Sequence, residues 1–146
     1  MAITSAICNS FKTEILKAVH NFTATTGNDF NIALYTSSAT LGAGTTAYGS
    51  SNEITNTSGS AYQPKGKVLT SVTPALDSTT AVCDFADVSW TSASFTANGC
   101  LIFNDDHSTD AAVCAVAFGG DKTVSSGTFT VQFPAAAATT AIIRIA

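Results

Sequence analysis

Charged side chains are scarce in this chain of 146 residues. They make up 11% of it, whereas about a quarter is usual in globular proteins. Only six are Lys or Arg, against ten Asp or Glu, which gives a net charge of -4. Nucleic-acid binding requires a basic face, and these six cations do not cluster along the chain. We therefore expect no nucleic-acid partner.

Long apolar runs are also missing. No stretch approaches the roughly 18 apolar residues that are needed to span a bilayer. The first residues lack the charged start and apolar core of a signal peptide. We therefore expect no membrane partner and synthesis in the cytoplasm.

Closely spaced cysteine pairs are absent as well, which argues against a zinc knuckle. Three of the four cysteines lie in apolar, β-prone runs, where small buried free thiols are the usual occupants. A disulfide between two of them is the alternative. The four are Cys8, Cys83, Cys100 and Cys114.

The sequence contains few residues suited to catalysis. His20 and His107 are its only histidines, and neither lies near a GxSxG motif. We expect His20 to close a surface helix and His107 to lie in a polar loop. A Cys–His pair has no support, because thiols in apolar runs are inert. We therefore expect no enzyme and no cofactor.

One segment partly matches a calcium loop. Oxygen-bearing side chains alternate at Asn104, Asp106, Ser108 and Asp110. Two later positions break the pattern, since Thr109 stands where such loops need glycine and Ala115 where they need glutamate. The alternative is a solvated turn between two strands, which Asn and Asp also favour. We expect the turn and no metal.

What the chain has in quantity is Ser and Thr, at about a quarter of its residues, together with β-prone apolar runs. One segment departs from that composition. Phe11, Ile15 and Val19 recur every four positions, and Phe22 continues the stripe. This spacing predicts an amphipathic helix over about residues 9–21.

The rest of the chain predicts short strands separated by turn signals. This pattern is typical of a mainly β fold, an antiparallel β-sandwich or jelly-roll-like barrel with one N-terminal helix, in a single domain over residues 1–146. Gly99 is a possible bulge, and Phe129, Val131 and Phe133 alternate with polar residues. The predicted strands cover residues 30–36, 68–75, 81–85, 88–90, 95–103, 111–118, 128–133 and 141–145.

A long loop over residues 37–60 is the main candidate for contact with a partner, because loops of this length are usually functional or flexible. It contains Tyr48 and Ile54, and Tyr62 follows it. Tyrosine is enriched in interface hot spots, so we expect Tyr48, Ile54 and Tyr62 to bind a partner. Sugar binding by exposed aromatic residues is an alternative, although Trp90 lies in a β run and is expected in the core.

Several segments resemble, in order and spacing, a family of small structural proteins of tailed bacteriophage virions. The resemblance covers nearly the whole chain. The segments are Asn9-Ser10-Phe11-Lys12, Ile32-Ala33-Leu34-Tyr35-Thr36-Ser37, Ala47-Tyr48, Asn52-Glu53-Ile54, Gly59-Ser60-Ala61-Tyr62, Ala86-Asp87-Val88-Ser89-Trp90-Thr91, Phe95-Thr96-Ala97-Asn98-Gly99-Cys100-Leu101-Ile102-Phe103-Asn104-Asp105, Phe118-Gly119-Gly120-Asp121-Lys122 and Gly127-Thr128-Phe129-Thr130-Val131.

The resemblance implies a virion location and no catalytic residues. Small β-rich virion proteins most often decorate or cement the capsid shell, so it implies a head decoration or cement protein whose partner is the major capsid protein. It also implies a homo-oligomer, for which we favour a trimer. A tail, baseplate or fibre component is the first alternative, and a carbohydrate-binding adhesion module is the second.

Overall fold

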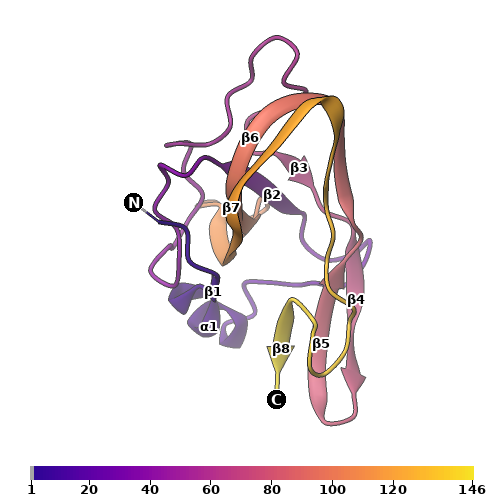
Figure 1. Ribbon diagram of the computed structural model, residues 1–146. Coiled ribbons are helices and arrows are strands. Elements are labelled where there is room, and N and C mark those ends of the chain that lie inside the picture. Colours follow the sequence, from indigo (N-terminus) through magenta and orange to yellow (C-terminus); the bar gives the residue numbers. More distant parts are fainter. Residues whose placement is uncertain (1) are drawn as a thin grey trace.

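The computed structural model describes residues 2–146, which form two antiparallel β-sheets and one short helix near the N-terminus (Figure 1). Strands account for 47% of the chain and the helix for 6%. The predicted mainly β, antiparallel fold is confirmed. A continuous hydrophobic core includes residues of both sheets and of the helix.

The larger sheet has the strand order β1-β7-β6-β2-β3, and the smaller has the order β4-β5-β8. The helix precedes β2 in the chain. The elements are β1 (Ala6–Ile7), α1 (Asn9–Leu16), β2 (Phe30–Tyr35), β3 (Lys67–Val68), β4 (Ser71–Asp77), β5 (Thr80–Phe85), β6 (Val88–Asn104), β7 (Ala111–Val131) and β8 (Ile143–Ile145).

Strand β2 lies inside the larger sheet, between β6 and β3. All six of its residues are buried, which matches its almost continuously apolar sequence, since a strand covered on both faces does not alternate with polar residues. Its pairing with β6 runs without a register shift from Phe30 opposite Asn104 to Tyr35 opposite Gly99. This regular pairing fixes the position of the loops that follow β2.

Strands β6 and β7 form one long hairpin that arches over the molecule (Figure 1). The sequence predicted two short strands where β6 lies and two where β7 lies. That prediction is wrong, because each pair is one continuous strand. Register shifts between Trp90 and Ala93, and between Ala97 and Gly99, keep the pairing going while the ribbon bends. The predicted irregularity at Gly99 is confirmed, and a Cβ atom there would lie 2.6 Å from the carbonyl oxygen of Val116.

The smaller sheet is built around β5, which pairs with β4 on one side and with β8 on the other. The β4–β5 hairpin projects from the end of the molecule opposite the top of the arch (Figure 1). Strand β4 has little cover, because Val72 is 46% exposed and Leu76 is 73% exposed. The predicted strand over residues 68–75 is divided here between β3 and β4.

The helix is shorter than predicted. It ends at Leu16 and not near residue 21, because Ala18 adopts a left-handed conformation with φ of 57°. Val19 therefore does not extend the helical stripe, and Phe11 is the only fully buried residue of the helix. Within residues 2–146, no helix is long and apolar enough to cross a bilayer.

Aromatic side chains join the helix to both sheets. Phe22, which follows the helix, stacks on Phe30 of β2 with ring centroids 4.2 Å apart, and Phe85 of β5 lies edge-on to Phe22 at 6.2 Å. Phe11 contacts Phe22 at 6.0 Å. Trp90 is 1% exposed, so its predicted place in the core is confirmed.

Gly66 is required where the chain enters β3. Its φ is +69°, and a Cβ atom there would lie 1.8 Å from the carbonyl oxygen of Ile32. Gly59 has a similar φ of +83° but open space around it. We predict that Gly59→Ala lowers the free energy of unfolding by about 1–2 kcal/mol, the usual strain of a left-handed alanine. Gly66→Ala should cost clearly more, because its methyl group also overlaps the β2 backbone.

Chemical denaturation of the two variants and the native chain measures both costs. Equal losses at Gly59 and Gly66 would contradict the close approach of the residue 66 backbone to β2.

Candidate functional site

The loop that was predicted to contact a partner folds back onto β2 around one acidic residue. Glu53 is 8% exposed, and its backbone forms an isolated antiparallel β-bridge with that of Tyr35 at the end of β2. Its side-chain oxygens accept three hydrogen bonds: from the Tyr48 hydroxyl at 2.6 Å, from the Tyr62 hydroxyl at 2.8 Å and from the Lys65 backbone N–H at 2.8 Å. We call these four residues the Glu53 cluster.

Tyr62 is the most deeply buried member of the Glu53 cluster. It is 0% exposed, and its ring lies 6.1 Å from that of Trp90. Its hydroxyl oxygen also accepts a hydrogen bond of 2.8 Å from the Leu34 backbone N–H. One hydroxyl group therefore satisfies both a buried backbone donor and a buried acidic side chain.

Tyr48 lies at the border between this cluster and solvent. Its ring is half-buried and stacks on Phe103 with centroids 4.8 Å apart. The Lys65 ammonium group lies 5.8 Å from the ring centroid. Lys65 also pairs with Asp105 at 2.8 Å and Asp110 at 2.9 Å, so the cluster is tied to the turn between β6 and β7.

Two of the three residues expected to bind a partner, Ile54 and Tyr62, are buried in the folded chain. Ile54 is 7% exposed, and its N–H donates to the carbonyl oxygen of Leu34, so this part of the loop adds to the edge of β2. Both residues belong to the hydrophobic core. Tyr48 keeps an exposed edge, and its role toward a partner stays a prediction.

The surroundings of these tyrosines make their hydroxyl groups poor acids. Burial raises the pKa of Tyr48 to about 12, and its hydrogen bond to Glu53 adds to the effect. Burial raises the pKa values of Tyr62 and Tyr35 further. The hydroxyl groups therefore remain protonated at neutral pH and serve as hydrogen-bond donors.

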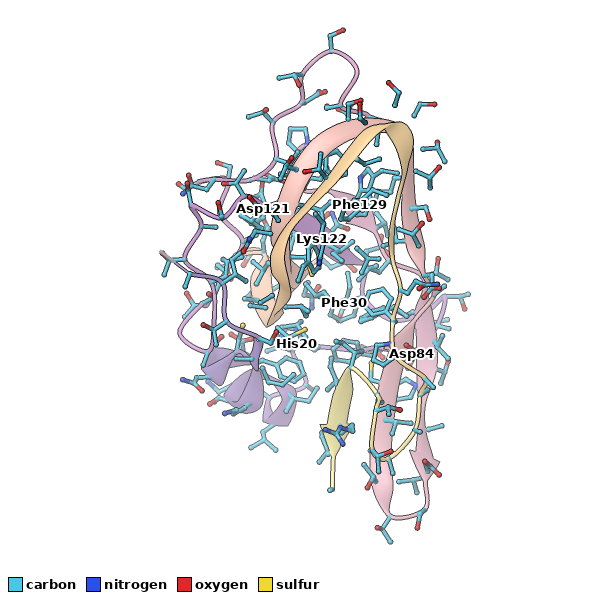
Figure 2. The ribbon with its side chains drawn as sticks, viewed as in Figure 1. His20, Phe30, Asp84, Asp121, Lys122 and Phe129 are labelled. Carbon is cyan, nitrogen blue, oxygen red and sulfur yellow. The ribbon has the colours of Figure 1, made fainter. Side chains whose placement is uncertain are left out.

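His20 is buried, which contradicts the predicted position at the end of a surface helix. Its Nε2 atom lies 2.9 Å from the Glu14 carboxylate, and its Nδ1 atom lies 3.2 Å from the amide nitrogen of Asn104. Because that amide nitrogen can only donate, Nδ1 accepts and Nε2 carries the proton that points to Glu14. Both ring nitrogens are thereby engaged within the fold, next to Phe30 (Figure 2).

The segment with the partial calcium pattern forms the turn between β6 and β7. The predicted turn is confirmed, and its Asp106, Ser108 and Thr109 are exposed. Asn104, at the end of β6, is fully buried, and its side chain bonds to Val19 and His20. Asp106 accepts a hydrogen bond from the Asp29 N–H at 2.8 Å. Among residues 2–146, no three His, Cys, Asp or Glu side chains are grouped so that they could hold a metal ion.

All four cysteines are buried and free, which confirms their predicted burial. Burial raises the pKa of Cys8 to about 11 and those of Cys83 and Cys100 to about 12. Burial also raises the pKa of Cys114 well above its usual value. Because the thiolate is the nucleophile, these neutral thiols are poorly suited to covalent chemistry.

Several grooves open on the surface, and two of them bear on the candidate contact surfaces. One, of about 930 Å³, lies between the N-terminal segment and residues 39–52, and its lining, which includes Thr4, Leu41, Thr45 and Asn52, has no charged side chain. The other, of about 420 Å³, follows the outer edge of β7.

The sequence contains the residues of the Glu53 cluster, but nothing in it distinguishes them from ordinary loop residues. An isolated acidic residue between Asn52 and Ile54 looks like any loop carboxylate. Burial of Tyr62 and Glu53 depends on how the loop folds across β2, and neither composition nor periodicity determines that path.

We predict that Tyr62→Phe lowers the free energy of unfolding by about 1–3 kcal/mol, because it leaves the buried Leu34 N–H without a partner and removes one of the two hydrogen bonds to Glu53 Oε1. Tyr48→Phe removes a single hydrogen bond at a half-exposed position and should cost less. Chemical denaturation of both variants tests this order. A larger loss for Tyr48→Phe would show that the buried hydroxyl is not the main support of the cluster.

Comparison of this chain with protein families, with curated proteins and with solved structures finds no match. The functional argument therefore rests on the chain's own residues. These are the internally engaged Glu53 cluster, the neutral buried thiols and a surface with few charges.

Proposed function

We propose that this protein is a structural component of a tailed bacteriophage virion, a head decoration or cement protein that binds and stabilises the assembled shell of the major capsid protein. The resemblance of its segments to that family is the origin of the proposal. Its physical support is the low fraction of charged residues, 11% of the chain, and the chemistry of the outer face of the β6–β7 hairpin.

Two neutral hydroxyl pairs lie on that outer face, the observation that favours a static interface most directly; a third pair, Asn98 with Asp121, includes one carboxylate. Hydroxyl groups of Ser89 and Thr130 lie 2.7 Å apart, and those of Thr96 and Thr123 lie 2.8 Å apart. Groups that already bond to each other lose little when water is removed, whereas isolated charges lose much. Such a surface suits permanent packing against another protein.

The carbohydrate-binding alternative has less support. Sugar sites commonly use exposed aromatic rings, but Trp90, Tyr35 and Tyr62 are each at most 1% exposed. A tail, baseplate or fibre component shares the physical argument and differs in copy number. We further propose that the protein attaches as a homo-oligomer, which the family resemblance implies and for which we favour a trimer.

Copy number separates the virion alternatives. In purified virions of the phage that encodes this chain, we expect a gel band comparable in molar amount to the major capsid protein. A band at a small fraction of that amount would favour a tail or baseplate part, and its absence would contradict the proposal.

Tyr48 tests whether the loop contributes to shell binding. After the protein is stripped from particles and rebound, Tyr48→Ala should lower occupancy, whereas Tyr48→Phe, which keeps the ring against Phe103, should not. Because the protein has few charges, native binding should vary little across a salt series. Unchanged occupancy for Tyr48→Ala would remove the loop from the interface, and collapse at moderate salt would show an electrostatic attachment.

A further inference from the structure

Most sheet edges in this protein are protected against pairing with another chain. Strands β1 and β3 are two residues long and β8 is three. Strand β4 is longer, but it contains Pro74 and a register shift between Val72 and Ala75. Short strands, prolines and bulges are the usual devices that prevent edge-to-edge association.

The outer edge of β7 lacks this protection over residues 127–131. Strand β1 pairs with β7 only opposite Cys114 and Ala115. Within residues 2–146, the described hydrogen bonds of residues 118–131 go only to β6. A shift in the pairing lies before Gly127, near Ser126 with its φ of 46°. A second shift, between Trp90 and Ala93, lies opposite Phe129 and Gly127, and its extra residue belongs to β6. From residue 127 to 131 β7 contains neither a charge nor a proline.

An apolar groove lies beside this open edge. It has a volume of about 420 Å³, and its lining includes Val116, Phe118, Phe129 and Val131, with Lys122 at its border (Figure 2 labels Phe129 and Lys122). Phe118 and Phe129 are half-buried, with ring centroids 6.1 Å apart. A strand added to the edge would cover these partly exposed rings.

We propose that residues 127–131 of β7 pair with the same residues of a second copy of this chain, antiparallel and about a twofold axis at Phe129. The segment is complementary to itself in this register. Gly127 then lies opposite Val131 of the second copy, and Thr128 lies opposite its Thr130. Thr–Thr and aromatic pairs across antiparallel strands are favourable, and no like charges meet.

The two Phe129 rings then contact each other on the groove side. The threonines face the outer side, together with the Ser89–Thr130 and Thr96–Thr123 hydroxyl pairs of the β6–β7 hairpin. A twofold contact uses the same patch on both subunits and closes after two copies. The inference deepens the homo-oligomer part of the proposed function and replaces the expected trimer by a dimer. It does not depend on binding to a capsid shell.

Two double variants test the register. Thr128→Lys with Thr130→Lys places lysines directly opposite each other across the proposed axis, so this variant should sediment as a monomer at concentrations where the native chain is a dimer. Thr128→Lys with Thr130→Glu places opposite charges there, and it should remain dimeric. Analytical ultracentrifugation over a concentration series measures all three chains.

A matched control keeps the same charges away from the proposed edge. Ser89→Lys with Thr91→Lys puts two lysines on the same face of the hairpin, but on β6, and it loses the same Ser89–Thr130 hydrogen bond. This control should dimerise like the native chain. Melting temperatures confirm that each variant is folded.

Three results would overturn the inference: a native chain that is monomeric or trimeric at every concentration, equal weakening by the control and the two-lysine variant, or loss of the dimer in both Thr128 variants. If a strand of a different protein naturally pairs with the β7 edge, the native chain alone should be monomeric at every concentration. Rebinding of the two-lysine variant to capsid shells tests the proposed function separately from the dimer. Shell binding can fail while the dimer persists, and the dimer can fail while shell binding persists.

Discussion

The burial of Glu53 is the constraint on which the arrangement of the loops depends. A buried acidic side chain is costly unless its oxygens are hydrogen-bonded, and here the Tyr48 hydroxyl, the Tyr62 hydroxyl and the Lys65 N–H supply three donors. Each donor comes from a different part of the segment that follows β2. Satisfying one side chain therefore determines where residues 48–65 lie, and through Lys65 it also positions the turn between β6 and β7.

A similar principle acts on the other side of the core. His20 and Asn104 are buried polar residues far apart in the sequence, and each satisfies the other. Asn104 also bonds to the carbonyl oxygen of Val19, which has no helical partner because the helix has already ended. These two side chains thus hold segments that are distant in the sequence against one another.

The sequence predicted the features that depend on local patterns. The strand over residues 30–36, the alternation around Phe129 and the burial of Trp90 follow from apolar spacing, and the structure shows all three. It did not predict features that depend on tertiary contacts. The helix ends early through the conformation of Ala18, and the bends in β6 and β7 are absorbed by bulges without ending the strands.

The candidate site shows the same division. Tyr48, Ile54 and Tyr62 were grouped because they lie in or beside a long loop, and two of them belong to the core for reasons that only the path across β2 reveals. The open edge of β7 was likewise invisible in the sequence, since a strand at an edge and a strand inside a sheet can have the same composition. Its identification required the sheet order and the extent of β1.

Amide hydrogen exchange in a Glu53→Ala variant tests the central role of this residue most directly. The account predicts that the Lys65 and Leu34 amides lose protection, because one loses its acceptor and the other depends on the position of Tyr62. Amides in the β2–β6 pairing, such as that of Leu101 opposite Ala33, should exchange as in the native chain. Unchanged protection at Lys65 and Leu34 would contradict the claim that Glu53 holds the loop in place.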